Sequence, residues 1–287
     1  MDSLESVHDA RAAPTFSPLN RSIPTCVFAS IYFHQVCFMD LSDYRSSPSE
    51  KARIGDLMDL LPDATESALD IGARDGFLSK LLANQFLRVT ALDLEQPVID
   101  HERILCVKGN ITALEFESNT FDLVFCAEVL EHIPPPLLEK ACAELGRVSK
   151  EHVLIGVPYQ QDTRVGRTTC GQCGKFNPPW GHVNSFDERR LAELFSGFSV
   201  VRQSFVGTTS VKTNALSSAM MDLAGNPYGT YSQDEPCIHC GAALGKPVQR
   251  NIWQKALTKA AVLSMAAQQK FVKPHGNWVH QLLKKRH

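Results

Sequence analysis

The sequence lacks a long apolar segment. Its nearest approach to a membrane span is residues 26–39, CVFASIYFHQVCFM, which are fewer than the roughly 20 residues that a bilayer requires. His34 and Gln35 also interrupt this segment. The first residues, MDSLESVHDAR, mix acidic and polar side chains, unlike a signal or transit peptide. We therefore expect a soluble, cytoplasmic protein in which residues 26–39 form a buried or lid-forming segment.

The chain also lacks an excess of either charge. It holds 29 Lys and Arg against 31 Asp and Glu, a formal net charge of -2. No global positive field is therefore available to attract nucleic acid. A length of 287 residues with 44% hydrophobic content suits one large domain, or one domain with additions. The charge balance counts against a nucleic-acid-binding protein.

Nine cysteines, an odd number without a secretory signal, argue against a disulfide scaffold and for a reducing compartment. Four of them form two copies of Cys-x-x-Cys-Gly, at 170–174 and 237–241. Each copy is a turn that presents two thiolates to one ion, and two such turns complete a tetrahedral Cys₄ site. We expect a structural Zn²⁺ bound by Cys170, Cys173, Cys237 and Cys240.

Two alternatives for these four thiols stay open, a redox dithiol or four unrelated thiols. A redox pair would stand at a helix N-terminus, and neither copy precedes a clear helical stripe. The remaining cysteines lie in apolar runs and are expected to be small core residues: Cys26, Cys37, Cys106, Cys126 and Cys142.

Strand-like and helix-like segments alternate between Ser67 and about Phe205. Such alternation predicts right-handed βαβ units and an α/β fold, with a parallel sheet covered by helices on both faces. Buried strands are predicted at 68–71, 88–94, 104–107, 121–126 and 152–157. Helical apolar stripes are predicted in four places: from Ile54 to Leu61, from Phe77 to Phe86, from Leu137 to Val148, and after a capping box at 185–188.

The domain boundaries follow from this alternation of strands and helices. Residues 1–45 are predicted to be an N-terminal arm whose aromatic stretch 23–41 is a possible lid. Residues 46–206 form the α/β domain, with a Cys-rich insertion at 168–180. Residues 207–287 form an extension with the second Cys motif. In it, a long amphipathic helix places seven apolar residues on one side: Ile252, Trp253, Ala256, Leu257, Ala260, Leu263 and Ala267. The basic end, 278–287, is interpreted as a solvated terminal helix, with contact to an anionic membrane as the alternative.

A glycine turn joins the first predicted strand to its helix. Gly72 and Gly76 allow the backbone to turn tightly and to approach a ligand, and the following helix N-terminus offers free N–H groups. Asp93 ends the next strand about twenty residues on, where a carboxylate accepts ribose hydroxyls of an adenosine ligand. An acid that only caps a turn is the alternative. Ala73-Arg74 stands where a dinucleotide-binding motif has its second glycine, so this turn is poorly suited to bind a pyrophosphate.

These motifs resemble those of class I S-adenosylmethionine-dependent methyltransferases from about residue 52 to residue 206. Leu69–Gly76 (LDIGARDG) is similar to the family's first motif, with Arg74 in place of a customary glycine. VKGN at 107–110, NTFDLV at 119–124 and EVLEHI at 128–133 follow in the family's order. The resemblance implies a Rossmann-like methyltransferase sheet. It implies that S-adenosylmethionine is bound by Asp70, Gly72, Ala73, Gly76, Asp93, Leu94, Asn110, Ile111 and Glu128.

Two histidines and two acids follow strands at the carboxyl edge of such a sheet. His182 is the preferred general base for an acceptor and His132 the second, beside Glu131 as a further catalytic candidate. With Glu128 they could instead bind a divalent ion, as in a metal-dependent branch of the family that includes ubiquinone-pathway O-methyltransferases and small-RNA 2′-O-methyltransferases. Purely positional roles are the third alternative.

The acceptor side offers one aromatic candidate. Trp180, after two prolines and immediately before Gly181-His182, could wall an acceptor pocket or simply pack in a rigid loop. The preferred function is O-methylation of a small molecule or glycan. The alternatives are an RNA 2′-O-methyltransferase, which the absence of a Lys/Arg stripe disfavours, and a non-catalytic zinc-stabilised binding or scaffold protein.

Overall fold

A computed structural model describes residues 45–64, 66–247 and 249–286. The predicted arm at 1–45 lies almost wholly outside these residues, and so does the possible lid at 23–41, with Cys26 and Cys37. In the described part of the chain, no helix is both long enough and apolar enough to cross a bilayer.

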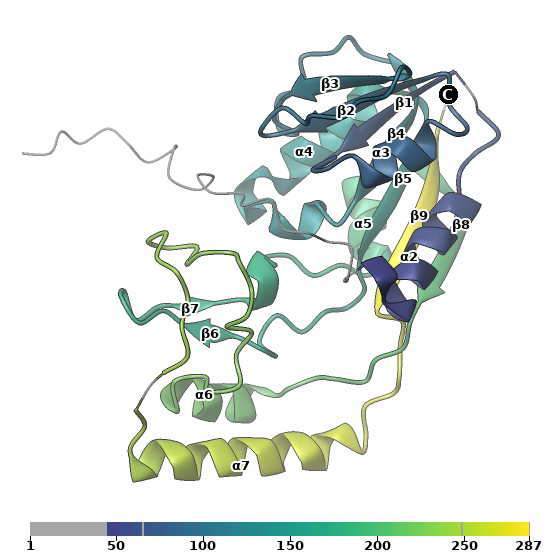
Figure 1. The fold of residues 1–287 in the computed structure, drawn as a ribbon. Coiled ribbons are helices and arrows are strands. Elements are labelled where there is room, and N and C mark those ends of the chain that lie inside the picture. The colour runs from purple at the N-terminus through teal and green to yellow at the C-terminus, as the bar shows by residue number, and fades with distance from the viewer. Residues whose placement is uncertain (1–44, 65, 248, 287) are drawn as a thin grey trace, which may run out of the picture. The chain divides into compact units, whose positions relative to one another are not determined.

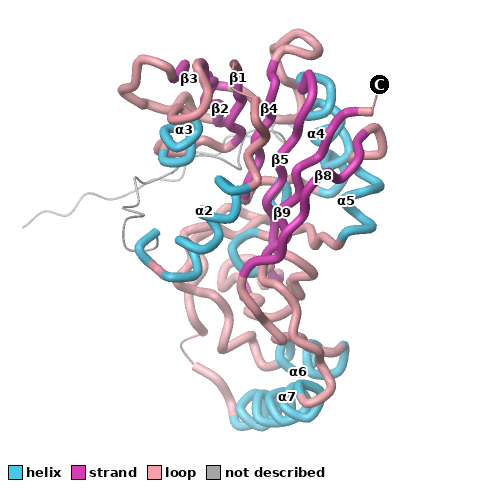
Figure 2. Tube along the Cα trace, turned by 90° about the vertical axis from the view of Figure 1, so that its right-hand side faces the viewer, coloured by secondary structure: helices cyan, strands magenta, loops and turns pink. Residues whose placement is uncertain are grey.

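A seven-stranded sheet forms the α/β part of the chain, in the order β3-β2-β1-β4-β5-β9-β8 (Figures 1 and 2). The pairs β3·β2, β2·β1, β1·β4 and β4·β5 are parallel, as the alternation of strands and helices predicted. The strands are β1 (Ser67–Ile71), β2 (Arg88–Asp93), β3 (Ile104–Lys108), β4 (Phe121–Ala127), β5 (Ser149–Pro158), β8 (Phe198–Val206) and β9 (Trp278–Lys285).

The basic end of the chain is a strand, so the prediction of a solvated terminal helix at 278–287 was wrong. β9 lies between β5 and β8 and runs antiparallel to both. Val279, Leu282 and Leu283 are buried, and the Lys285 ammonium donates to the carbonyls of Gly146 and Ser149 at 2.9 and 2.8 Å. The sheet is therefore mixed. Because β9 belongs to it, the part of the chain that forms the sheet does not end at residue 206, where we had placed the boundary of the α/β domain.

Helices cover both faces of the sheet. Leu57 of α2 (Pro48–Asp59) and Leu82 of α3 (Phe77–Leu82) belong to the apolar core on one face. Leu145 of α4 (Pro135–Val148) and Leu191 of α5 (Glu188–Leu194) belong to the core on the other. A Rossmann-like sheet with two covered faces is thus confirmed.

Three details differ from the sequence expectations. β3 is an edge strand and is not buried, since Leu105 is largely exposed. Leu137 points away from the buried face of α4. The N-cap of α5 is Asp187, whose side chain accepts from the amide of Arg190, and not Ser185 of the proposed capping box.

The Cys-rich insertion and the extension contain short elements and a helix pair. β6 (Thr168–Thr169) pairs with β7 (Phe176–Asn177), and the 3-10 turn η2 (Pro179–Gly181) follows. α6 (Ala215–Leu223) lies beside α7 (Ile252–Gln269), as Figure 1 shows. The long helix that the sequence predicted is therefore present.

Candidate functional site

The turn between β1 and α3 depends on two glycines with positive φ. Gly72 has φ of 77°, and a Cβ built there would stand 2.5 Å from the Cγ2 atom of Val129. Gly76 also has φ of 77°, and a Cβ there would overlap Ile99. Only glycine meets both conditions, because L side chains rarely adopt this backbone conformation. The turn is therefore held close to the segments after β2 and β4, as a ligand-binding turn requires.

Asp70 stands one residue before the end of β1 and is buried. The Ser79 hydroxyl of α3 donates to its Oδ2 at 2.5 Å. Burial raises the pKa of Asp70 to about 7, against the opposing effect of the Ser79 hydrogen bond. The side chain therefore ties the strand to the helix after the glycine turn.

Asp93 organises the glycine turn from the next strand. Its Oδ2 accepts from the amide of Arg74 at 2.9 Å, and its Oδ1 accepts from the amide of Leu94 at 2.6 Å. Each carboxylate oxygen keeps a second lone pair, which is what two ribose hydroxyls would need. Ala73, whose amide donates to the carbonyl of Leu92 at 3.1 Å, completes the contact between the turn and β2.

Asn110 lies beside the same edge but uses its side chain differently from what we expected. Its carbonyl oxygen accepts from both the amide and the hydroxyl of Thr112, each at 2.9 Å. Both hydrogen bonds are local, so the side-chain oxygen of Asn110 is engaged by the turn that follows β3. The neighbouring Ile111 is buried in the core.

Main-chain hydrogen bonds bring the two histidine segments together. The amides of Val183 and Asn184 donate to the carbonyl oxygen of Glu131 at 2.8 and 3.2 Å. The Asn184 side chain donates to the carbonyls of Leu130 and Ile133 at 2.8 and 2.6 Å. These bonds fasten the segment after η2 to η1 (Leu130–His132), so residues about fifty positions apart in the sequence lie side by side.

Glu131, His132 and His182 converge there. One carboxylate oxygen and one ring nitrogen from each histidine all lie within 4.8 Å of one another. The carboxylate of Glu131 is fully buried, and neither of its oxygens has a hydrogen-bond partner among the described residues. Burial raises the pKa of Glu131 well above its usual value, so its ionised form needs a positive charge such as a bound cation beside it. Carboxylate oxygen and imidazole nitrogen also form a usual donor set for divalent ions, so these residues fit one.

His182 is held in one orientation by Gln161. Its Nδ1 lies 2.7 Å from the Oε1 of Gln161, and because a carbonyl oxygen only accepts, Nδ1 carries the hydrogen. Nε2 then keeps a lone pair for a proton or a metal. Burial, followed by the neighbouring His132, lowers the pKa of His182 to about 3.

His132 stands edge to face against His182, with ring centroids 4.7 Å apart. Part of its ring is exposed to solvent. Desolvation in the cleft, and then the Arg74 guanidinium, lowers the pKa of His132 to about 4. Both imidazoles are therefore neutral near pH 7, the form that binds metals and accepts protons.

Glu128 lies outside this group of converging ligand atoms. The indole Nε1 of Trp278 donates to its Oε2 at 3.2 Å, and an Arg53 guanidinium nitrogen lies 3.8 Å from its Oε1. Desolvation raises the pKa of Glu128 to about 7, opposed by Arg53 and Trp278. Glu128 has φ of 57°, so the chain bends sharply just after β4.

Trp180 flanks the cluster on the side of His182. Its ring centroid lies 6.0 Å from that of His182, and nearly half of the side chain is exposed. Its amide donates to the Oε1 of Gln233 at 2.6 Å, so the extension holds the η2 turn. A Cβ built at Gly181 would lie 3.5 Å from Glu235 and 3.6 Å from the Nδ1 of His132.

The four cysteines of the two motifs form one cluster. The Sγ atoms of Cys170 and Cys240 are 3.7 Å apart, and those of Cys173 and Cys237 are 3.6 Å apart. All four lie within 4.8 Å of one another. A tetrahedral zinc with bonds of about 2.3 Å keeps its sulfur ligands about 3.8 Å apart, whereas a disulfide needs about 2.05 Å. The spacing fits one tetrahedral ion and excludes a pre-formed disulfide.

The two Cys motifs have the same backbone structure. In each, the glycine amide donates to the carbonyl of the first cysteine, at 2.9 Å for Gly174 and 2.8 Å for Gly241. The Ile238 amide donates to the side chain of Asn177 at 2.8 Å, which joins the second motif to β7. The insertion and the extension are thus linked by protein contacts as well as by the thiols.

Sequence reasoning missed four residues of this site: Gln161, Arg53, Trp278 and Glu235. Gln161 is the third residue after β5, and this position beyond a strand was its only available signal. Arg53 and Trp278 come from segments that we had placed outside the site. Their roles depend on the pairing of β9 and the packing of α2, which no local pattern shows.

Residues 69–155 match the family model described as a methyltransferase domain. The ubiquinone biosynthesis O-methyltransferase of Idiomarina loihiensis is 29% identical over 125 residues, covering 32% of this chain and 51% of that protein. The one from Xylella fastidiosa is 38% identical over 88 residues, covering 27% and 36%. The chain spans about half, or less, of the length of these curated relatives.

One solved structure similar to this chain is the Burkholderia thailandensis 1,6-didemethyltoxoflavin-N1-methyltransferase with bound 1,6-didemethyltoxoflavin and S-adenosylhomocysteine. It is 16% identical, the match covers 86% of this chain and 84% of that one, and the TM-score is 0.48.

Proposed function

We propose that this chain, which carries a class I S-adenosylmethionine-dependent methyltransferase domain, methylates an oxygen of a small molecule or glycan with the help of a divalent ion. The observation that carries the proposal is the convergence of Glu131, His132 and His182 around a buried carboxylate with no partner. The relatives reported above are ubiquinone biosynthesis O-methyltransferases, which supports oxygen as the acceptor atom.

The methyl donor would be held by the edge around the glycine turn. The positive-φ glycines at 72 and 76 bring the backbone close to the donor, and Asp93 offers its free lone pairs to the ribose hydroxyls. The sulfonium group is already activated as a leaving group, so the main task of the protein is in-line alignment with the acceptor. Trp180 would hold an acceptor ring or sugar face beside the cluster.

The acceptor hydroxyl must also lose its proton. Glu131, His132 and His182 would hold the ion, and a divalent ion bound there supplies a Lewis acid that lowers the pKa of the acceptor hydroxyl. Gln161 fixes the tautomer of His182 so that the lone pair of Nε2 stays available to the ion. Glu128, bonded to Trp278 and close to Arg53, supports the turn after β4.

We propose a second, structural ion in the Cys₄ cluster. A closed set of four thiolates leaves no open position for a substrate, so this Zn²⁺ would do no chemistry. It would keep the η2 turn and Gln233 beside His182, and thereby support the wall of the acceptor pocket.

The proposal is tested with Mn²⁺ as the probe. Electron paramagnetic resonance should show a bound Mn²⁺ in the full chain, with affinity at least tenfold weaker in Glu131→Gln. Glu139→Gln, an exposed acid of α4, is the matched control and should bind as the wild type does. Equal Mn²⁺ binding in all three proteins contradicts the metal site.

Methyl transfer is tested separately. Protein with radiolabelled S-adenosylmethionine is offered catechols, hydroxybenzoates, sugars and a short RNA, with and without chelator. Labelled catechol, hydroxybenzoate or sugar that disappears with chelator supports the proposal. Label on the RNA alone favours the RNA alternative. Calorimetry that detects no binding of S-adenosylmethionine contradicts the enzyme proposal as a whole.

A further inference from the structure

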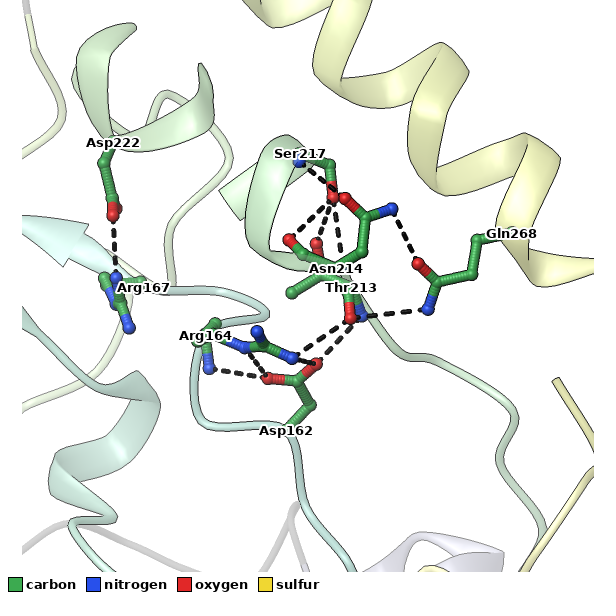
Figure 3. Close-up of polar contacts among 8 residues, drawn as sticks. All are labelled: Asp162, Arg164, Arg167, Thr213, Asn214, Ser217, Asp222 and Gln268. Carbon is green, nitrogen blue, oxygen red and sulfur yellow. Dashed lines mark hydrogen bonds and ion pairs between the residues drawn. The ribbon is translucent and has the colours of Figure 1, made fainter. Parts of the chain in front are cut away.

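α7 packs with its polar face inward. Its residues Thr258, Ser264 and Gln268 lie on the side that meets the rest of the chain, and they make hydrogen bonds there. The Asn214 side chain donates to the Oε1 of Gln268 at 2.6 Å and to the Ser264 hydroxyl at 3.3 Å, as Figure 3 shows for Gln268. The same side also carries the buried Ala261 and the half-buried Leu257, so hydrogen bonds and apolar contacts together hold it against the chain.

Further polar contacts hold the same arrangement. Gln269 of α7 donates to the hydroxyl of Ser210 at 2.7 Å, and Arg250 donates to the Thr258 hydroxyl at 3.0 Å. Arg164, paired with Asp162, donates to the carbonyl of Thr213 at 3.1 Å (Figure 3). The orientation of α7 about its axis is therefore fixed by several bonds.

The opposite side of α7 is apolar and exposed. We call it the outer face of α7 and define it as Ile252, Trp253, Ala256, Ala260, Leu263 and Ala267. Ile252, Trp253 and Leu263 are 78%, 77% and 70% exposed, and the three alanines are exposed as well. The sequence predicted this stripe correctly except for Leu257, which turns inward. An amphipathic helix normally buries its apolar stripe. α7 instead exposes its stripe, as is expected of a helix that docks on a partner.

The charge around this face has one sign. Nine Lys and Arg and no Asp or Glu follow Glu235, so the net charge of -2 divides into -11 for residues 1–235 and +9 for residues 236–287. Lys255 and Lys259 are exposed on α7 next to the apolar stripe, and Lys246, Lys270 and Lys273 are exposed near its ends. None of these five lysines has an ion pair with another described residue.

We propose that the outer face of α7 docks on an anionic lipid bilayer. A helix that combines an apolar stripe containing Trp and Leu with flanking lysines lies in the headgroup layer of such membranes, parallel to the surface. The stripe enters the acyl boundary while the lysines contact anionic headgroups. A nucleic acid would leave Ile252 and Leu263 in water, and an uncharged protein partner would leave the lysines unpaired. The inference is independent of the proposed methyl transfer.

The test is flotation of the full chain with vesicles. Vesicles of phosphatidylglycerol and phosphatidylcholine should carry the protein at low salt, and pure phosphatidylcholine should carry little. Leu263→Glu should lower the partition coefficient about tenfold or more. Leu105→Glu, at an equally exposed leucine of β3, is the matched control and should float as the wild type does.

The electrostatic part is tested with Lys255→Gln and Lys259→Gln. Each should lower the partition coefficient about fivefold, since a lysine near an anionic surface contributes about 1 kcal/mol. Lys140→Gln on α4 should have no effect. Trp253 fluorescence should shift to the blue on vesicle binding, and Trp253→Phe should remove this shift.

Three results would overturn the proposal. One is equal flotation of Leu263→Glu and the wild type. Another is equal flotation with charged and neutral vesicles. The third is a dimer in sedimentation equilibrium that Leu263→Glu dissociates, because the stripe would then be covered by a second copy of the chain. S-adenosylmethionine binding, followed in parallel, should be the same in Leu263→Glu as in the wild type.

Discussion

The indole Nε1 of Trp278 donates a hydrogen bond to the Oε2 of Glu128 at 3.2 Å, across 150 positions of the sequence. Glu128 opens the segment that carries Glu131 and His132, and Trp278 begins β9. The last strand of the sheet therefore reaches the edge where the candidate site lies.

Trp278→Phe should remove this bond while keeping an aromatic ring at the start of β9. Desolvation raises the pKa of Glu128 to about 7, and the hydrogen bond from Trp278 opposes this rise. Loss of the bond should therefore raise the pKa above about 7. We expect the free energy of unfolding at pH 8 to fall by about 1–2 kcal/mol. Urea denaturation measures it, and an unchanged midpoint would show that the bond contributes nothing.

Removal of residues 278–287 should abolish folding. β5 would lose its antiparallel neighbour, β8 would lose its only pairing partner in the described sheet, and the buried Val279, Leu282 and Leu283 would be missing. The measurement is soluble expression followed by circular dichroism. A variant that lacks His287 alone is the control and should fold. A folded, cooperative product of the longer deletion would contradict the role of β9.

The Cys₄ cluster predicts one zinc per chain. Cys173→Ser or Cys240→Ser should lower the zinc content, measured by mass spectrometry of the purified protein, to well below one ion per chain. Cys106→Ser, at a thiol outside the cluster, should leave the content unchanged. Strong chelation should also destabilise the chain, since structural zinc contributes to folding. Zinc retained in both cluster variants would contradict the site.

Asp70 predicts a pH dependence of stability with a definite sign. Its folded pKa, about 7, lies above the ordinary 3.8, so the folded state holds a proton that the unfolded state loses. The wild type should therefore lose stability relative to Asp70→Asn as the pH rises from 4 to 7, by about 4 kcal/mol in total. Denaturant unfolding of both proteins at several pH values gives the difference. A constant difference would mean that Asp70 titrates normally.

Gly72→Ala should damage the glycine turn. The new Cβ would require a strained positive φ and would overlap Val129. We expect a loss of about 1–3 kcal/mol in the free energy of unfolding and weaker binding of S-adenosylmethionine by calorimetry. Gly55→Ala is the matched control. It lies inside α2 with open space around its Cβ position, so it should stabilise the protein by about 0.5–1 kcal/mol. Unchanged binding in Gly72→Ala would argue against a ligand at this turn.

Local sequence patterns were sufficient to predict much of the α/β part of the chain. Apolar runs bounded by turn residues placed β1, β2, β4 and β5, because buried strands and their turns are specified by neighbours in sequence. The same holds for the glycine turn, for Asp93 and for the two Cys motifs. For these, the chemistry of a residue and its spacing in the chain carry the information.

The sequence by itself determined a methyltransferase-like sheet, the glycine turn at its edge and four clustered thiols. Only the tertiary structure decided that residues 278–285 are an internal strand, because antiparallel pairing depends on partners about 80 and 125 positions away. It also decided that Glu131 meets His182 while Glu128 turns to Trp278. The same reason explains α7: periodicity reveals an apolar stripe, but the distant hydrogen-bond partners of its polar side decide which face is left exposed.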